Sequence, residues 1–288
     1  MFKSLAPGAI GVKATLEEGL AFAGAAGFQG LDVNIREVAA YVREKGADHV
    51  TGLFRDAGLK IGAWGLPVAW NGPLEDYKRE LHVLPGLAEA AASVGAFRVS
   101  QWIPPASDDR PFREQFQWCL GRLRPICDVL KDHGCSLGLE FIGPRTQRID
   151  RTYGFIHSIA GMLGFCEALG TGNAGLLLDC WHWYTSLGTL ADMRGLTPDD
   201  VIHVHVNDAP ADVAVGEQVD QVRALPSETG VIDLVGFLSA LNVIGYKGPV
   251  TPEPFSRKVR ELPASEAVRV THRGLDEAWR AAGLNSRD

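Results

Sequence analysis

The chain has 288 residues, of which 46% are hydrophobic and 22% are charged, and its formal net charge is −7. This composition predicts a globular protein with a large core, and the acidic balance argues against a nucleic-acid partner because phosphate binding needs a basic surface. No apolar run approaches the roughly 20 residues of a membrane span, and the N-terminus lacks the pattern of a signal peptide. The five cysteines form no Cys-x-x-Cys pair, so we expect reduced core thiols in a cytoplasmic protein.

Predicted strands and helices alternate along the chain. Short apolar runs predict strands at residues 5–12, 28–34, 59–64, 96–102, 135–141, 175–180, 201–206 and 249–253. Helical periodicity predicts helices at about residues 14–26, 35–57, 74–94, 111–133, 153–169, 189–194, 234–244 and 264–282. Several helices end directly before a glycine, as at Gly27 and Gly95, which is a common way for a helix to stop.

Eight strands that are each followed by a helix predict an α/β fold, a (β/α)8 TIM barrel. No linker or change of composition divides the chain, so we expect residues 1–288 to form a single domain. A doubly wound sheet is the alternative. It is disfavoured because the loop after the first predicted strand lacks the G-x-G-x-x-G spacing of a phosphate-binding turn.

Four of the apolar runs end on a side chain that can bind a metal ion. These side chains are Glu140, Asp179, His205 and Glu253, at the ends of the fifth to eighth strands. Active sites of TIM barrels lie at these strand ends, and a buried carboxylate needs a counter-charge or a metal. Three carboxylates and one imidazole suit one divalent metal ion. Mn²⁺ is our first choice, and Mg²⁺, Co²⁺ and Zn²⁺ are the alternatives.

Such a site suits proton transfer on an α-hydroxy carbonyl compound, whose two adjacent oxygens could bind a metal with open coordination positions. Glu140 and Glu253 would flank the metal, so one could remove a proton and the other return one. A metal would polarise the carbonyl and stabilise the resulting enediolate. Return of a proton to the opposite face of the same carbon gives epimerisation, and delivery to the former carbonyl carbon gives isomerisation.

Further residues are predicted to contact the substrate. His182 follows Asp179 by three positions and could donate a hydrogen bond to the substrate carbonyl. Arg223 lies in the longest strand-to-helix connection, at residues 207–230, and long loops are often functional. Three tryptophans at predicted strand ends could wall a sugar-sized pocket: Trp64, Trp102 and Trp181.

Other polar residues receive structural interpretations. We expect His203 to face the helices, on the opposite side of its strand from His205, as a packed core histidine. Asp32 and Asp208 could orient a histidine or the substrate, or they could pair with a Lys or Arg of a loop; both interpretations stay open.

These residues carry a family resemblance. The series Glu140, Asp179-x-x-His182, His205-x-Asn-Asp208, Arg223 and Glu253 resembles the xylose isomerase-like TIM barrel superfamily of sugar isomerases and epimerases. Within it, the chain is most similar to the branch of keto-inositol isomerases, hydroxypyruvate isomerases and ketose 3-epimerases. The resemblance implies a metal bound by Glu140, Asp179, His205 and Glu253, the two glutamates as acid and base, and substrate contacts from His182 and Arg223.

The leading hypothesis is therefore a metal-dependent isomerase or epimerase of a small polyhydroxy ketone: a keto-sugar, a keto-inositol or a hydroxy-keto acid. A dehydratase or lyase that follows the same enolisation with β-elimination is the main alternative. A non-catalytic sugar-binding barrel is a third hypothesis. An abasic-site endonuclease is disfavoured because Trp64, Gln101 and Trp102 stand where its extra histidines are expected. The loop at residues 102–106 could cover the site or meet a second subunit of a homo-oligomer.

Overall fold

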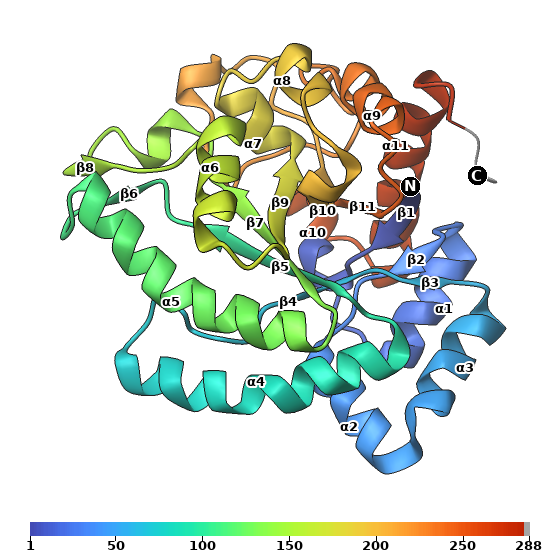
Figure 1. Ribbon diagram of the computed structural model, residues 1–288. Coiled ribbons are helices and arrows are strands. Elements are labelled where there is room, and N and C mark those ends of the chain that lie inside the picture. The colour runs from blue at the N-terminus through green and yellow to red at the C-terminus, as the bar shows by residue number, and fades with distance from the viewer. Residues whose placement is uncertain (285–288) are drawn as a thin grey trace.

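Parallel strands form a ring at the centre of the computed structural model, which describes residues 1–284 (Figure 1). They are β1 (Phe2–Leu5), β2 (Gly30–Leu31), β3 (Lys60–Ile61), β4 (Ala63–Gly65), β5 (Arg98–Ile103), β7 (Ser136–Phe141), β9 (Ala174–Asp179), β10 (Val201–Val206) and β11 (Pro249–Pro252). Neighbours pair in the order β3-β2-β1-β11-β10-β9-β7-β5-β4. Four strands are therefore consecutive neighbours in the ring: β7, β9, β10 and β11.

The ring closes at a break within the third predicted strand. β3 and β4 stand at the two ends of the ladder, yet only Gly62 separates them in the sequence. A Cβ atom on Gly62 would clash with the carboxylate of Asp32, so this position needs glycine for close approach. The Val33 amide donates to the Ala63 carbonyl at 2.9 Å, which joins β2 to β4. β3 and β4 together fill the position of the third predicted strand, so nine short strands occupy the eight positions of the barrel. The predicted (β/α)8 barrel is confirmed.

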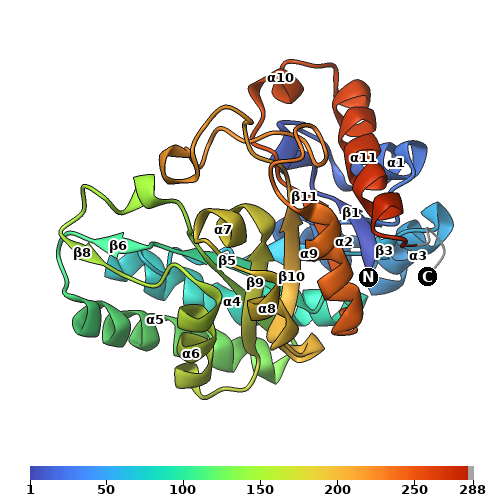
Figure 2. The same cartoon turned by 90° about the horizontal axis from the view of Figure 1, so that it is seen from above.

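Helices surround the strands, as the view from above shows (Figure 2). They are α1 (Leu16–Ala26), α2 (Ile35–Lys45), α3 (Ala47–Ala57), α4 (Leu74–Val94), α5 (Phe112–Asp132), α6 (Ile159–Leu169), α7 (Cys180–Thr185), α8 (Leu190–Arg194), α9 (Leu234–Val243), α10 (Arg257–Arg260) and α11 (Ala264–Ala281). The last long helix, α11, packs against the first, α1. None of the helices within residues 1–284 has the length and apolarity needed to cross a bilayer.

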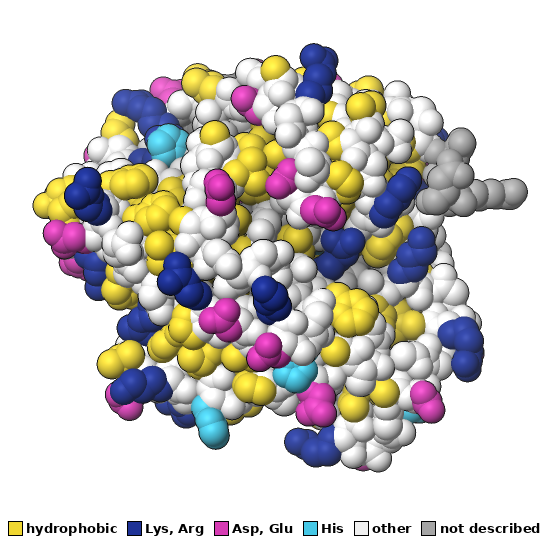
Figure 3. Space-filling view, in the orientation of Figure 1, with side chains coloured by type: hydrophobic (Ala, Val, Ile, Leu, Met, Phe, Trp, Pro, Cys, Tyr) yellow, Lys and Arg dark blue, Asp and Glu magenta, His cyan; other side chains and the backbone are white. Residues whose placement is uncertain are grey.

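Smaller elements lie in the connections between the strands and the helices. The 3-10 turns η1 (Pro7–Ile10), η2 (Arg145–Gln147) and η4 (Val215–Glu217) follow β1, β7 and β10, and η3 (Pro198–Asp200) precedes β10. β6 (Ala106–Ser107) and β8 (Tyr153–Gly154) form a separate antiparallel pair. On the face seen in Figure 3, Lys and Arg side chains are interspersed with Asp and Glu.

The structure corrects several predicted boundaries. The first strand was expected at residues 5–12 but occupies Phe2–Leu5, because Pro7 starts a 3-10 turn that ends at Gly11 in the left-handed conformation. The single helix expected at residues 35–57 is two helices, since Gly46 adopts a positive φ of 86° between them. Both errors have one cause, because an apolar or periodic run does not show where a glycine or proline turns the backbone.

Two further boundaries were wrong near the candidate site. The helix expected from residue 153 begins only at Ile159, where Ser158 caps it by accepting from the Gly161 amide. Cys180, expected as the last strand residue, is the first residue of the unpredicted helix α7. The Asp179 carboxylate accepts the Trp181 amide at 2.8 Å and so caps α7. Asp179 therefore both ends β9 and caps α7.

Candidate active site

The four predicted metal ligands meet at the carboxyl ends of consecutive strands. Glu140 lies near the end of β7, Asp179 ends β9, His205 lies near the end of β10, and Glu253 directly follows β11. Each offers a ligand atom within 4.8 Å of the corresponding atoms of the other three. Because parallel strands in a barrel end on the same rim, residues 39, 26 and 48 positions apart in sequence come together here.

Two buried atoms of this cluster have no hydrogen-bond partner. His205 Nδ1 lies 3.6 Å from Glu140 Oε1 and 3.5 Å from Glu253 Oε2. Neither His205 Nδ1 nor Glu140 Oε1 is hydrogen-bonded within the described part of the chain. Burial raises the pKa of Glu140 to about 8. Unpartnered buried polar atoms are rare in proteins, and an oxygen-rich set with one imidazole is the donor set of a divalent cation, so these residues fit a metal ion.

Arg223 reaches the same cluster from the loop at residues 207–230. Its Nη1 atom donates to Asp179 Oδ2 at 2.7 Å and to Glu253 Oε2 at 3.2 Å. Its Nη2 atom donates to Asp220 Oδ1 at 2.7 Å. The side chain is only 1% exposed. Arg223 is therefore not a surface charge but a buried cation that partly neutralises the acidic cluster.

His182 lies beside the cluster and is neutral. The Gly143 amide donates to its Nδ1 atom at 3.2 Å, and burial lowers its pKa to about 3. A neutral imidazole has one acceptor nitrogen, so Nδ1 as acceptor leaves the proton on Nε2. Arg223 Nη2 lies 3.3 Å from Nε2, but two donors cannot bond each other, and that Arg223 nitrogen already has Asp220 as its acceptor. Nε2–H is thus a donor, and it lies 3.9 Å from Glu140 Oε1; its contact with a substrate stays a prediction.

Two site residues were missed by sequence reasoning. Asp220 pairs with Arg223 and lies 3.8 Å from His182 Nε2. Asn207 donates from Nδ2 to Asp179 Oδ1 at 3.2 Å. The spacing of three residues between Asp220 and Arg223 within the long loop was a signal that could have identified the first. The second, Asn207, stands in the series His205-x-Asn-Asp208, but no role was predicted for it.

The prediction for His203 was wrong. Its side chain points into the barrel, where Nδ1 lies 2.8 Å from Ser100 Oγ and Nε2 lies 3.0 Å from Thr251 Oγ1. Its ring centroid is 4.7 Å from that of His205. Residues i and i+2 of a strand share one face, so His203 and His205 had to face the same way. His203 is nevertheless buried and packed, and its Nε2 atom is 3.3 Å from Asp32 Oδ2.

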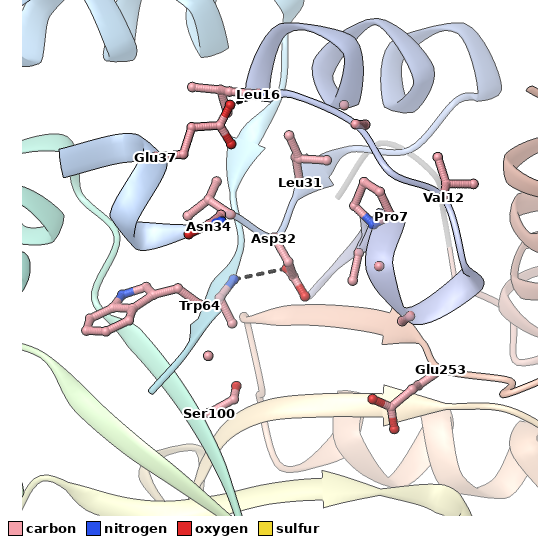
Figure 4. Close-up of a pocket in the computed structure, with 18 of the residues that line it drawn as sticks. Pro7, Val12, Leu16, Leu31, Asp32, Asn34, Glu37, Trp64, Ser100 and Glu253 are labelled. Carbon is pink, nitrogen blue, oxygen red and sulfur yellow. Dashed lines mark hydrogen bonds between the residues drawn. The ribbon is translucent and has the colours of Figure 1, made fainter. Parts of the chain in front are cut away.

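Two cavities border the cluster. The larger has a volume of about 730 Å³, lies over the ends of β1, β2 and β4, and is called here the β1–β2 cavity; its lining includes Leu16, Leu31, Trp64, His205 and Glu253 (Figure 4). The smaller, of about 330 Å³, is called the Arg223 cavity; its lining includes Trp102, Glu140, His182, Arg223 and Glu253. Glu253 of the cluster lines both cavities.

The three predicted tryptophans occupy different environments. Trp64 lines the β1–β2 cavity and donates from Nε1 to the Ala96 carbonyl at 2.8 Å. Trp102 is 48% exposed and lines the Arg223 cavity. Trp181 is fully buried, and the Arg223 guanidinium lies 5.3 Å from its ring centroid. Trp181 therefore packs against Arg223, and its contact with a substrate stays a prediction.

The chain is thus a barrel with three carboxylates and a histidine on one rim. The family model described as the xylose isomerase-like TIM barrel matches residues 20–276, and the chain belongs to this family. The family resemblance found in the sequence is thus confirmed.

Known proteins share both sequence and fold with the chain. Inosose isomerase from Halalkalibacterium halodurans is 27% identical over 231 residues, which cover 80% of this chain and 78% of that protein. The structure of a xylose isomerase domain protein from Alicyclobacillus acidocaldarius has a TM-score of 0.85 and 30% identity, and the match covers 98% of this chain and 99% of that chain. The crystal structure of the IOLI protein with a binding zinc atom has a TM-score of 0.79 at 19% identity, and the match covers 99% of this chain and 100% of that chain.

The relatives also include an L-ribulose 3-epimerase and a 3-dehydroshikimate dehydratase. The prediction that the chain is an enzyme of the sugar isomerase and epimerase class is confirmed by these relatives.

Proposed function

We propose that the chain is a divalent-metal-dependent isomerase or epimerase of a small polyhydroxy ketone, either a keto-sugar, a keto-inositol or a hydroxy-keto acid. One observation carries the proposal. Glu140, Asp179, His205 and Glu253 converge within 4.8 Å at the rim where barrel active sites lie. The named isomerase and epimerase relatives support the reaction class.

Glu140, Asp179, His205 and Glu253 would hold the metal ion. Such an ion supplies positive charge next to a developing enediolate, which lowers the barrier to proton removal beside a carbonyl. Mn²⁺ remains our first choice because three of the four donors are hard carboxylates, and Zn²⁺ gains support from the zinc atom bound in the IOLI structure.

The surroundings shift the pKa values of the two glutamates in opposite directions. Burial raises the pKa of Glu140 to about 8. Burial also acts to raise the pKa of Glu253, but the charges of His205 and Arg223 outweigh it, and the net shift is downward. As metal ligands both carboxylates would be ionised, so one would accept the substrate proton and the other would return it. His182 would donate from Nε2 to the substrate oxygen that gains charge.

The first experiment measures metal content by elemental analysis on protein purified without chelator. We expect about one divalent ion per chain in the wild type, a strong loss in Asp179→Asn, and no loss in Asp32→Asn, since Asp32 is a barrel carboxylate outside the four-residue cluster. A metal-free wild type after incubation with Mn²⁺, Co²⁺ or Zn²⁺ would contradict the proposal.

The second experiment measures exchange of substrate protons with solvent deuterium, using keto-inositols and ketoses. Exchange without loss of water from the substrate identifies an isomerase or epimerase, whereas a dehydrated product identifies β-elimination. A metal-loaded protein that binds these ketones without any exchange would be a non-catalytic sugar-binding barrel.

A further inference from the structure

A third cavity, of about 490 Å³, lies apart from the acidic cluster and is called here the Arg148 cavity. Its lining comes from the segment between β7 and α6, from the end of α7 and from η4. The lining includes Arg145, Arg148 and His157, but no Asp or Glu and no residue of the acidic cluster. The whole chain has a net charge of −7, so this cavity is locally positive on an acidic protein.

Arg145 and Arg148 line one cavity because a single 3-10 turn joins them. The turn η2 begins at Arg145, and the Arg148 amide donates to the Arg145 carbonyl at 3.0 Å. A 3-10 helix has three residues per turn, so side chains three positions apart lie on the same side of it. The turn is also bound to the loop at residues 207–230, because Thr146 Oγ1 donates to the Gln218 carbonyl at 2.8 Å. The backbone therefore places both guanidinium groups beside the cavity.

The guanidinium of Arg148 is half-buried, and its hydrogen-bonding capacity is only partly used. Its Nη2 atom donates to the Gly143 carbonyl at 3.0 Å. Its Nε atom is buried and has no hydrogen-bond partner among the described residues, which is rare for a buried donor. Burial and the charge of Arg145 lower the pKa of Arg148, and no carboxylate of residues 1–284 counters them. Both guanidinium groups stay charged, so two like charges and an unused donor stand at this cavity.

The chemistry of the lining selects an oxyanion as the ligand. Thr185 Oγ1 donates to the Trp181 carbonyl at 2.7 Å, and Ser186 Oγ donates to the Trp183 carbonyl at 3.0 Å. Their protons are used within α7, so the guanidinium groups are the main donors to a ligand. The planar fork of a guanidinium matches phosphate and carboxylate oxygens. Two positive charges favour phosphate, which carries a charge of about −1.5 to −2 at pH 7 when it is a monoester.

We propose that the Arg148 cavity binds a phosphate group, either as inorganic phosphate or as part of a small phosphate monoester. The site is separate from the acidic cluster, and the inference does not rest on the proposed function. It is nevertheless connected to the candidate active site. Arg148 donates to the Gly143 carbonyl, and the Gly143 amide donates to His182 Nδ1 at 3.2 Å. A phosphate on Arg148 would therefore stabilise the segment that positions His182.

The test measures the dissociation constants of inorganic phosphate and of glucose 6-phosphate by calorimetry on the full chain. We expect saturable binding of at least one of them to the wild type. Arg145→Gln and Arg148→Gln should each weaken that binding by about tenfold or more, because each removes a hydrogen bond between charged groups. Arg145 is exposed, so Arg145→Gln leaves the packing intact and decides the question even if Arg148→Gln is unstable.

The matched control is Arg151→Gln. Arg151 lies in the same segment but pairs with Asp108 at 3.1 Å and is not part of the lining, so its replacement should leave the affinity unchanged. Tighter binding of glucose 6-phosphate would support a monoester as the ligand, and equal affinities would support inorganic phosphate. Unchanged affinity in both Arg145→Gln and Arg148→Gln would overturn the inference, because the phosphate would then bind elsewhere, for example at Arg223. The absence of saturable binding of either compound to the wild type would overturn it as well.

Discussion

At the scale of single residues, His182 shows how burial and one backbone contact select a chemical form. The Gly143 amide occupies Nδ1, and burial holds the pKa of the imidazole at about 3. The side chain therefore stays neutral across the physiological pH range, with its proton on Nε2. A neutral donor can stabilise charge that develops on a substrate oxygen without repelling the nearby Arg223.

Two substitutions distinguish the roles of the two ring nitrogens of His182. Glutamine can place an amide donor near the Nε2 position, whereas asparagine keeps only a group near Nδ1 for the Gly143 amide. We expect His182→Asn to lower kcat by about 10²–10³-fold, as for loss of an oxyanion donor, and His182→Gln to lower it much less. Steady-state kinetics at matched metal occupancy checks this. Equal losses in the two variants would mean that the Nε2–H donor is not used.

At the scale of elements, the loop at residues 207–230 owes its order to Asp208. This fully buried carboxylate accepts from four backbone amides: Ala209, Thr229, Gly230 and Ile232, at 2.7–3.0 Å. Asp208 also exchanges two backbone hydrogen bonds with Ala224, next to Arg223. The structure thus answers the question left open for Asp208, because it binds backbone amides and pairs with no Lys or Arg of the described chain.

Replacing this carboxylate should loosen the loop that carries Arg223. In Asp208→Asn the new amide group donates where backbone amides also donate, so we expect a loss of about 2–3 kcal/mol in unfolding free energy and a higher KM. Asp212→Asn, an exposed position in the same loop, is the control and should change neither quantity. Denaturant unfolding and amide hydrogen exchange of the loop are the measurements. Unchanged exchange in Asp208→Asn would contradict this account.

At the scale of the whole molecule, one buried ion pair joins the start of the barrel to its last helix. Lys3 Nζ on β1 lies 2.5 Å from Asp276 Oδ1 on α11, and the two residues are 2% and 7% exposed. Burial acts to raise the pKa of Asp276, but the hydrogen bond and charge of Lys3 outweigh it, and the net shift is downward. The ion pair thus links two residues that are 273 positions apart in the sequence.

The lowered pKa fixes the sign of the pH dependence. Ionised Asp276 contributes stability above its unfolded pKa of about 3.9, and the contribution is lost as the pH falls through the lower folded-state value. At pH 7, Asp276→Asn should lose about 3 kcal/mol because it leaves Lys3 buried without a counter-charge. The difference from wild type should shrink in acid, as measured by unfolding at several pH values. Glu266→Gln, which breaks an exposed pair with Arg269, should show little effect at any pH.

The sequence predicted most of the architecture but not its irregularities. Alternating strands and helices were readable because their apolar periods differ. The split of the third strand at Gly62 could not be predicted from these patterns, since it depends on the approach of Asp32, which follows β2. The division of the helix at Gly46 and the start of a 3-10 turn at Pro7 depend on backbone angles that apolar patterns do not encode.

The sequence by itself determined the eight-fold barrel and the four residues that converge on its rim, because strand ends are marked where an apolar run meets a metal-ligand side chain. Only the tertiary structure decided that Arg223 is buried among those carboxylates, that Asp220 supports it, and that two cavities flank the cluster. The physical reason is that these features arise between loops distant in sequence. Their contacts depend on how the closed barrel places each strand end, and no local pattern records that placement.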